Sequence, residues 1–453
     1  MNNLCWHLLP LENHTASEVF ANLFLRENSI ATLLESPFPA PQPQLSRYSI
    51  CAGSPRLNQK GKPQLWTPQL GQILPFLKAL LAQQKLEEEN ERDFLPFQGG
   101  WLGWLGYDLA WEIEKLPQLN PDPLPFPVAY WYEPASFAVL DHLQQNLWLA
   151  ANTQTELDQL QKAWETGEKE LETQSSIIQS SPISFLTSQA DYEHAVTRAK
   201  KYIQIGDIFQ TNISLRFQTS TNASSWEIYR QLQSINPSPF ASYWQTPWGA
   251  VISCSPERLV QLRDNCTQTR PIAGTRSRGT TSQKDQLLQE ELLTNTKENA
   301  EHIMLVDLER NDLGKVCQWG SVEVDELLTI EKYSHVMHLV SNVTGTLQSH
   351  LDAIDLITAM FPGGTITGCP KVRCMEIIEE LEPLRRNLFY GSCGYIDYRG
   401  NLELNILIRT LLVSSYFVWG QVGAGIVADS DPEKEWQESF HKAEAQLVAL
   451  GKY

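Results

Sequence analysis

Two acidic stretches, NTKENAE at residues 295–301 and DPEKEWQE at residues 431–438, constrain the fold of this chain more than any other part of it. Each stretch carries two glutamates three positions apart, and residues with that spacing share one face of a helix. The four glutamates are Glu298, Glu301, Glu435 and Glu438. Two such faces directed at each other would form a pocket of carboxylate oxygens, which a hard divalent cation such as Mg²⁺ prefers. We therefore expect the fold to bring these distant stretches together.

The chain is strongly acidic, with a formal net charge of −18 over 453 residues. Nucleic acids and anionic membranes are bound by clusters of Lys and Arg, so this charge argues against both as partners. An anionic substrate would need a local positive charge, which a bound metal ion can supply. The length allows two or three ordinary domains or one large one, and the abundance of aromatic residues is typical of a folded globular protein.

Cysteine usage and the N-terminal sequence both predict a cytoplasmic protein. The eight cysteines are scattered and form no Cys-x-x-Cys pair, so a thiolate zinc site is not expected. In a chain of this length they indicate free, buried thiols in a reducing compartment. The first residues lack the pattern of a secretory signal, and no apolar run approaches the ~20 residues that a membrane span requires.

The composition changes twice along the chain, which predicts three parts. Residues 1–150 are rich in Pro, Trp and Leu, and their glycine-aromatic run at 99–107 is typical of strands packed closely against another backbone. Residues 151–184 are predicted to form a surface helix followed by a polar linker. Residues 185–453 begin with a helical pattern at 187–205 and continue with many strand-like runs.

The last helix has clear start and stop signals. Asp431 can cap it, Pro432 suits its first turn, and Gly451 follows its end. One apolar stripe runs along it, formed by Trp436, Phe440, Ala443 and Leu447. Glu435 and Glu438 lie away from this stripe, as the residues of an ordinary solvated acidic face would.

A series of motifs follows in a fixed order along the C-terminal part of the chain. They are GDIFQTN at 206–212, SPERL at 255–259, PIAGTR at 271–276, ENAEHIMLVDLERND at 298–312, HVMHLVS at 335–341, FPGGTITGCPK at 361–371, IRT at 408–410, GAGIVADS at 423–430 and the terminal helix. In this order they resemble the chorismate-utilising enzymes, a family that includes component I of anthranilate synthase and of aminodeoxychorismate synthase, and the isochorismate and salicylate synthases.

The resemblance is strong over residues 185–447 and weaker over the first 150, where LLES at 33–36 and RYSI at 47–50 carry it. It implies an α+β fold with two large antiparallel β-sheets packed face to face and helices outside. The N-terminal and C-terminal regions are then expected to share one compact body.

The resemblance also implies that Mg²⁺ binds the ring carboxylate of chorismate. Glu301 and Glu438 match the direct metal ligands, with Glu298 and Glu435 as their outer partners. The ion would neutralise the repulsion between a dicarboxylate substrate and an acidic chain, and it would withdraw electrons from the ring.

Arg409 matches the arginine that holds the enolpyruvyl carboxylate of chorismate. Its planar guanidinium can give a carboxylate two parallel hydrogen bonds. It lies inside the strand-like run 405–413, which favours a paired, functional arginine over a surface one. Backbone amides around Gly423 and Gly425 can approach the same anion because glycine has no Cβ.

Three further residues match groups that act on the ring. Glu257 resembles the acid that releases the C4 hydroxyl, which requires burial or a neighbouring anion to raise its pKa. The alternative is a salt-bridged strand end next to Arg258. His338 matches the site histidine, which could orient the leaving water or take a ring proton, although a histidine in an apolar strand is more often simply packed. Thr365 matches a contact to a substrate oxygen.

Gln210 and Ala273 bear on which reaction is catalysed. Members that add water at C2 carry a lysine at the position of Gln210, and glutamine cannot act as a base, so ammonia is the expected nucleophile. The C-terminal third most resembles aminodeoxychorismate synthase component I, which aminates C4 for 4-aminobenzoate and folate synthesis. Ala273 departs from the nucleophilic lysine of some of those enzymes and is the residue of the anthranilate type. Amination at C2 with loss of pyruvate, for tryptophan synthesis, is therefore the alternative.

The sequence also predicts partners. It contains no glutaminase signature, so ammonia is expected from a separate glutamine amidotransferase subunit. Leu34, Glu35 and Ser36 resemble the tryptophan-pocket segment of the family, and a plain strand edge is the alternative. An inactive, tryptophan-sensing subunit would have lost the metal glutamates, Arg409 or His338, and all of these are present.

Overall fold

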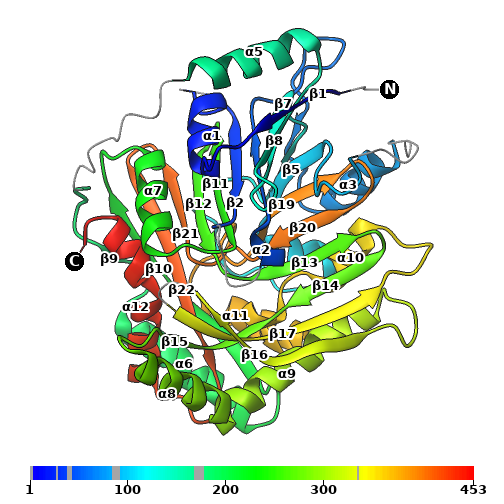
Figure 1. Ribbon diagram of the computed structural model, residues 1–453. Coiled ribbons are helices and arrows are strands. Elements are labelled where there is room, and N and C mark those ends of the chain that lie inside the picture. Colours follow the sequence, from blue (N-terminus) through cyan, green and yellow to red (C-terminus); the bar gives the residue numbers. More distant parts are fainter. Residues whose placement is uncertain are drawn as a thin grey trace.

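Two antiparallel β-sheets form the body of the protein (Figure 1). The computed structural model describes residues 4–26, 29–37, 43–83, 92–167, 178–333 and 336–452. The predicted fold class, α+β with two large antiparallel sheets and helices outside, is confirmed.

The larger sheet has 12 strands within the described residues. In spatial order they are β1 (Cys5–Pro10), β8 (Asn146–Ala151), β7 (Ser136–Asp141), β3 (Tyr48–Ala52), β2 (Ala31–Glu35), β11 (Phe240–Thr246), β12 (Gly249–Ser255), β21 (Thr410–Ser414), β22 (Phe417–Ile426), β10 (Gln210–Ser220) and β18 (Gly368–Cys369), with β9 (Ser184–Phe185) beside β10.

The smaller sheet has 10 strands in the part of the chain that the structure describes. They are β15 (Ile272–Ser277), β17 (Val336–Thr346), β14 (Cys266–Arg270), β13 (Arg258–Arg263), β20 (Leu402–Asn405), β19 (Ser392–Asp397), β5 (Gly100–Leu105), β6 (Ala129–Tyr132) and β4 (Leu65–Trp66), with β16 (Glu323–Lys332) beside β17.

Each sheet combines strands from the N-terminal and C-terminal regions of the chain. In the larger sheet β2 pairs with β11, and in the smaller sheet β5 pairs with β19. The glycine-rich run is needed for the second pairing, because a Cβ at Gly100 would overlap the backbone of β19. The close approach expected of this run is confirmed.

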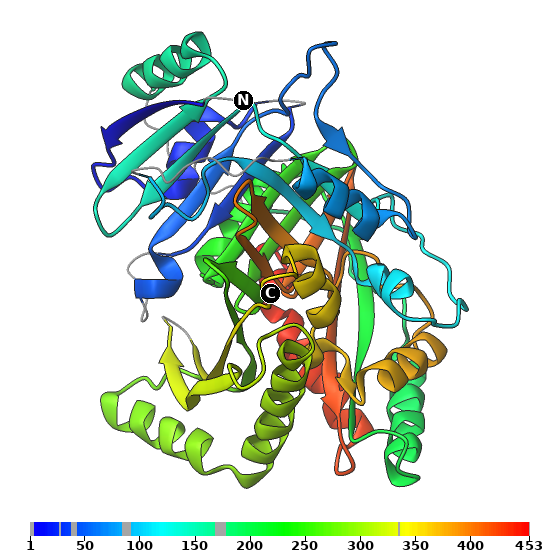
Figure 2. The same ribbon diagram turned by 90° about the vertical axis from the view of Figure 1, so that its right-hand side faces the viewer.

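Helices cover the outer faces of both sheets (Figures 1 and 2). Those packed on the larger sheet include α1 (Ala16–Leu23), α5 (Gln154–Thr166), α6 (Gln189–Gln204), α7 (Ser225–Ile235), α11 (Lys371–Leu381) and α12 (Pro432–Ala449). The other helical segments are α2 (Pro43–Ser46), α3 (Ile73–Ala82), η1 (Tyr107–Leu109), α4 (Ala110–Ile113), α8 (Ser282–Thr294), α9 (Thr296–Gly314), α10 (Ala353–Met360) and η2 (Gly364–Ile366).

The sheets are held together by large aromatic side chains. Trp104 of β5 and Trp244 of β11 are fully buried, and their rings meet edge to face with centroids 5.9 Å apart. Such a pair adds about 0.5–1.5 kcal/mol to the burial of its apolar area. A second core lies between the larger sheet and its helices and includes Phe20, Tyr192 and Tyr229.

The predicted helices are present. The Asp431 side chain accepts a hydrogen bond from the backbone N–H of Lys434 at 3.1 Å, Pro432 is the first residue of α12, and Gly451 follows its end with φ +72°. Helix α6 matches the pattern at 187–205. In the predicted helix-and-linker region, α5 is the helix, and residues 168–177 of the linker lie outside the described residues.

One strand prediction is wrong. The run 405–413 is not a continuous strand, because β20 ends at Asn405 and β21 begins at Thr410 in the other sheet. Arg409 lies in the crossing segment with φ +52°, a left-handed conformation that is uncommon outside glycine. A break between two sheets cannot be distinguished from one long strand by apolar pattern alone.

The eight cysteines are all free, and five of them are buried. In the described part of the chain, no helix combines the length and the apolar character that crossing a membrane requires.

Candidate active site

The candidate residues gather where the chain crosses between the two sheets. Glu257 lies between β12 of the larger sheet and β13 of the smaller one, and Arg409 lies between β20 and β21. The two crossings touch, because the backbone N–H of Ile406 donates to the carbonyl of Glu257 at 3.0 Å. The sheet architecture therefore brings together motifs that are 150 residues apart.

Glu257 is a buried acid rather than a salt-bridged strand end. Its side chain is 5% exposed, and burial raises its pKa from 4.5 to about 8. The nearby carboxyl of Glu309 adds to the increase, whereas the Thr365 hydroxyl and the backbone N–H of Ile272 oppose it. Arg258 pairs with Glu403 instead, at 2.5 Å. At neutral pH Glu257 thus keeps a proton that it can donate.

His338 and Arg409 lie close enough to interact electrostatically. His338, on β17, is 6% exposed, and its Nδ1 lies 2.9 Å from the Thr275 hydroxyl of β15. Burial, together with repulsion from Arg409, lowers the pKa of His338 to about 4. The imidazole is therefore neutral at pH 7 and can accept a proton.

Arg409 is a cation without a carboxylate partner among the described residues. The side chain is half-buried; desolvation lowers its pKa, and Tyr390 opposes that decrease. A guanidinium that is partly removed from water normally pairs with an anion. Its environment is thus suited to an anionic ligand.

Gln210 lies against the glycine-containing strand β22. The Gln210 amide fills the space where a Cβ at Gly425 would lie, and the Asn212 amide does the same at Gly423. Gln210 Oε1 and Asn212 Oδ1 are both buried and lack hydrogen-bond partners within the described structure. Two unsatisfied buried carbonyls of this kind can receive N–H donors from a ligand.

Of the first acidic stretch, Glu298 is clearly oriented. Its Oε1 accepts a hydrogen bond from Arg276 at 2.9 Å. Its Oε2 is buried, lies against Gly274, and has no hydrogen-bond partner among the residues described. An anionic oxygen without a partner fits the donor set of a hard cation such as Mg²⁺. Glu301, one helical turn further along α9, is half-buried.

The second acidic stretch is less uniform than the sequence suggests. Glu435 is buried, whereas Glu438 is exposed and pairs with Lys442 at 2.7 Å. Lys442 also donates to the Gly423 carbonyl at 3.2 Å, which connects this helix to the glycine strand. The expectation of a uniformly solvated acidic face is therefore wrong for Glu435.

The four glutamates do not form a preassembled cage. Within the described ranges, no group of three or more histidine, cysteine, aspartate or glutamate side chains is close enough together to hold a metal ion. The magnesium ligand set therefore stays a prediction, supported by the unsatisfied oxygen of Glu298.

Ala273 lies half-buried on β15, between Ile272, whose N–H faces Glu257, and Gly274, which Glu298 contacts. Its methyl group offers no nucleophile. Ala273 therefore lies close to Glu257 and to the first acidic stretch, but its side chain has no reactive group.

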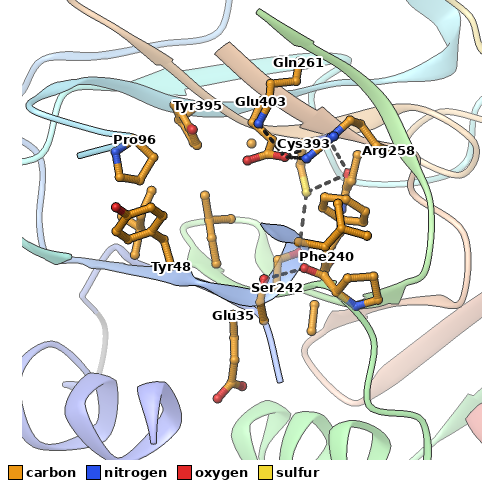
Figure 3. Close-up of a pocket in the computed structure, with 18 of the residues that line it drawn as sticks. Glu35, Tyr48, Pro96, Phe240, Ser242, Arg258, Gln261, Cys393, Tyr395 and Glu403 are labelled. Carbon is orange, nitrogen blue, oxygen red and sulfur yellow. Dashed lines mark hydrogen bonds and ion pairs between the residues drawn. The ribbon is translucent and has the colours of Figure 1, made fainter. Parts of the chain in front are cut away.

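The predicted tryptophan segment lines a separate cavity of about 300 Å³ between the two sheets (Figure 3). Leu34, Glu35 and Ser36 all border it. The Glu35 carboxylate points away from the cavity in Figure 3 and accepts hydrogen bonds from Ser17 and Tyr229, at 2.8 and 2.6 Å from the two hydroxyls. Glu35 thus supports the cavity wall and does not face a ligand.

The cavity extends to Arg258, the residue that follows Glu257. Arg258, directly after Glu257, lines it together with its partner Glu403 (Figure 3). A ligand in the cavity would therefore contact the strand that begins directly after Glu257.

Sequence reasoning missed two groups at the site. Glu309 is a second buried carboxyl near Glu257, and Asn212 is paired in register with Gly425 on β22. Both lie inside the quoted motifs. A charged residue between the apolar positions of a buried helix face was the available signal for Glu309.

Comparisons with known proteins agree with this arrangement. A model of the chorismate binding enzyme family matches residues 50–448. An anthranilate synthase component I-like protein from Synechocystis sp. is 60% identical and covers 98% of this chain and 91% of its own length. Aminodeoxychorismate synthase component 1 from Bacillus subtilis is 44% identical and covers 89% of each chain.

The crystal structure of anthranilate synthase component I from Streptococcus pneumoniae is also similar. Its TM-score is 0.77 at 31% identity, and the match covers 88% of this chain and 92% of that one. A menaquinone-specific isochorismate synthase from Escherichia coli has the same fold, with a TM-score of 0.75 at 18% identity over 99% and 94% of the chains.

The chain therefore belongs to the chorismate-binding enzymes. The predicted resemblance is confirmed, and its close relatives include component I of both anthranilate synthase and aminodeoxychorismate synthase.

Proposed function

We propose that this protein aminates chorismate at C4 with ammonia, in a magnesium-dependent reaction that gives 4-amino-4-deoxychorismate for 4-aminobenzoate and folate synthesis. The observation that carries the proposal is Glu257, a carboxyl buried between the sheets with a pKa of about 8. Loss of the C4 hydroxyl requires an acid that is still protonated at neutral pH. Glu257 meets that requirement.

Arg409 and the glycine strand would bind the enolpyruvyl carboxylate. The guanidinium has no carboxylate partner in the described structure, and backbone N–H groups near Gly423 and Gly425 can approach an anion closely. An arginine that is already partly desolvated gains more from such a pair than an exposed one.

The two acidic stretches would hold Mg²⁺ against the ring carboxylate, with Glu301 and Glu438 as direct ligands and Glu298 and Glu435 as outer partners. Magnesium supplies positive charge that offsets the repulsion between two anions and withdraws electrons from the ring. Closure of α9 and α12 around the substrate would bring the four side chains together, since the described residues form no cage without it.

Gln210 would orient the incoming ammonia. Its buried Oε1 lacks a hydrogen-bond partner and can accept an N–H, and an amide cannot remove a proton from water. The neutral imidazole of His338 would orient the leaving water, and the Glu257 carboxylate formed when the hydroxyl is protonated would take the proton that the amine loses, with Thr365 close beside it. Ammonia would be delivered by a separate glutamine amidotransferase subunit, as the name "component 1" of the relatives suggests.

The second candidate is amination at C2 with loss of pyruvate, giving anthranilate. Ala273 favours it, because it replaces a lysine that would act as a nucleophile in the C4 reaction of some relatives. The name of the 60% identical relative points the same way.

The test is the product formed from chorismate, Mg²⁺ and an ammonium salt, separated by liquid chromatography. A product that yields 4-aminobenzoate only after an aminodeoxychorismate lyase is added would support the proposal. Anthranilate formed directly would overturn it in favour of the second candidate. Unchanged chorismate would favour an inactive, tryptophan-sensing subunit.

We also propose that the cavity beside Leu34 and Ser36 binds tryptophan. Its volume of about 300 Å³ is at the lower end of the usual range for small-molecule sites. The aromatic and apolar side chains Tyr48, Phe240 and Tyr395 line it together with Arg47 and Arg263, a combination suited to an indole with a carboxylate.

A further inference from the structure

A second buried carboxyl lies on the far side of the segment that contacts Glu257. Glu309, on α9, is 4% exposed, and its Oε1 lies 3.3 Å from the backbone nitrogen of Gly364. Thr365, the next residue, is close enough to the Glu257 carboxyl to lower its pKa, and its buried hydroxyl has no hydrogen-bond partner among the described residues. The two glutamates therefore flank the same pair of residues, one on each side.

The Thr269 hydroxyl connects Glu309 to the strand that follows Glu257. It donates to the Leu259 carbonyl at 2.9 Å and to Glu309 Oε2 at 3.2 Å. A hydroxyl has one hydrogen, so the two acceptors share it. This bond favours the anion of Glu309. Leu259 is two residues after Glu257, so this chain of bonds connects the two acids.

The surroundings of the two carboxyls are unequal. Burial raises the pKa of Glu309 to about 7 and Asp312 adds to the increase, whereas Lys371 of α11, the N–H of Gly364 and the Thr269 hydroxyl oppose it. Glu257 has no cation among its main influences, and its pKa is about 8. Glu309, with Lys371 beside it, is thus better placed than Glu257 to carry the negative charge. Its charge then disfavours ionisation of Glu257.

The groups that most influence the two carboxyls, among the described residues, belong to the elements packed around them. Around Glu257 they are Glu309 of α9, with the neutral donors Thr365 of η2 and Ile272 of β15; around Glu309 they are Asp312 of α9 and Lys371 of α11, with Thr269 of β14 and Gly364 of η2. Lys371 is itself paired with Asp312 at 2.5 Å, so its charge is shared between two carboxyls. The net field at Glu257 is thus set largely by the charge of Glu309.

We propose that Glu309 is a positioning residue that keeps Glu257 protonated and holds the Gly364–Thr365 segment against it. This inference rests on the proposed function of Glu257 as the acid for the C4 hydroxyl. Glu309 itself touches no reacting atom, because the Gly364–Thr365 segment lies between it and the acid. Two carboxyls coupled in this way titrate as a pair.

The test is the variant Glu309→Gln, assayed by chorismate consumption with Mg²⁺ and an ammonium salt across the pH range. The carbonyl oxygen of glutamine can accept from Gly364 or from Thr269, so the variant keeps the size of the side chain and one of these hydrogen bonds while removing the charge. We expect the alkaline limb of the kcat profile to move down by about one pH unit, with activity on the acidic side within about twofold of the parent. Glu309→Asp keeps the charge, so its alkaline limb should lie close to that of the parent.

The matched control is Glu379→Gln. Glu379 is also 4% exposed and accepts backbone hydrogen bonds from Leu119 and Asn120 at 2.7 and 3.0 Å, but it is not among the groups that influence Glu257. Its alkaline limb should coincide with that of the parent. An alkaline limb of Glu309→Gln that stays in place or moves upward, in a protein that unfolds at the parent temperature, would overturn the proposal.

An infrared titration of the carboxyl C=O band tests the same pair without relying on the Glu309 variants or on turnover. In the parent protein, two more carboxyls should titrate between about pH 6 and 9 than in a Glu257→Gln, Glu309→Gln double variant. Glu257→Gln alone should lower the pKa of Glu309. A Glu309 titration unaffected by Glu257→Gln would refute the coupling. A parent protein that consumes no chorismate, or that makes anthranilate, would count against the proposed function and leave this readout intact.

Discussion

Arg276 Nη2 lies 2.9 Å from Glu298 Oε1, and the other oxygen of that carboxylate faces Gly274 without a hydrogen-bond partner in the described structure. One oxygen of the Glu298 carboxylate is thus held by Arg276, and the other is available to a ligand. On the opposite helix, Lys442 pairs with Glu438 in a comparable way. Each acidic stretch therefore carries its own counter-charge, which a metal ion would have to displace or share.

We expect Glu301→Gln to abolish magnesium-dependent turnover while the protein still folds. The side chain is half-buried at the start of α9, so the loss of one charge should change the free energy of unfolding by no more than about 0.5 kcal/mol. Chorismate consumption at saturating Mg²⁺ and the thermal unfolding temperature are the two measurements.

The control for this variant is Glu291→Gln, since Glu291 also pairs with Arg276, at 3.2 Å, but belongs to neither acidic stretch. It should keep near-parental activity and Mg²⁺ dependence. Turnover surviving in Glu301→Gln at the parental level would show that the metal assignment is wrong. Removal of Mg²⁺ by a chelator should mimic Glu301→Gln in the parent and be reversed when the ion is restored.

Glu257→Gln should lose activity and gain stability. Loss of the acid is expected to lower kcat by about 10²–10⁴-fold. In the folded protein the pKa of Glu257 is raised to about 8 from 4.5, so the folded state holds a proton that the unfolded state releases. Parent stability therefore falls relative to the variant as the pH rises from 4.5 to about 8, and the difference is constant above that.

The measurement for this pair of effects is the unfolding temperature of both proteins at several pH values. The two should agree at the acidic end and diverge towards alkaline pH, with the variant higher. Curves that run parallel over the whole range would mean that Glu257 is not held protonated, and the acid assignment would fail with it.

How much the sequence could predict differed between residues. The motif order was sufficient to predict the fold, because it is shared with the family, and it named the metal candidates and Glu257, whose roles stay predictions. The protonation of Glu257 could not be predicted, since it depends on burial by distant segments and on Glu309, which is 52 positions away in the numbering. The crossing at Arg409 was missed for a similar reason: sheet membership is set by pairing partners, which an apolar run does not specify.

Arg409→Lys should raise KM for chorismate by about 10–100-fold with a smaller effect on kcat, because a lysine cannot give a carboxylate two parallel hydrogen bonds. Steady-state kinetics in chorismate measure this.

Arg409→Gln should in addition raise the pKa of His338 above its present value of about 4, because repulsion from the guanidinium contributes to that low value. Nuclear magnetic resonance of the imidazole in the free protein would report it, and an unchanged titration would show that the two side chains do not interact.

Tryptophan should raise the unfolding temperature of the parent protein, since a ligand that binds only the folded state stabilises it. Tyr48→Ala should weaken this effect by about tenfold, because Tyr48 lines the cavity and a buried aromatic contact often contributes more than 1 kcal/mol to binding. Tyr416→Ala removes an exposed tyrosine elsewhere and should leave the effect unchanged.

If tryptophan also inhibits turnover, Glu403→Gln should weaken the inhibition more than the binding, because Glu403 holds Arg258, which follows the catalytic acid. Inhibition that is lost in proportion to binding would mean that the cavity and Glu257 communicate by another route, and the absence of any stabilisation by tryptophan would remove the ligand assignment altogether.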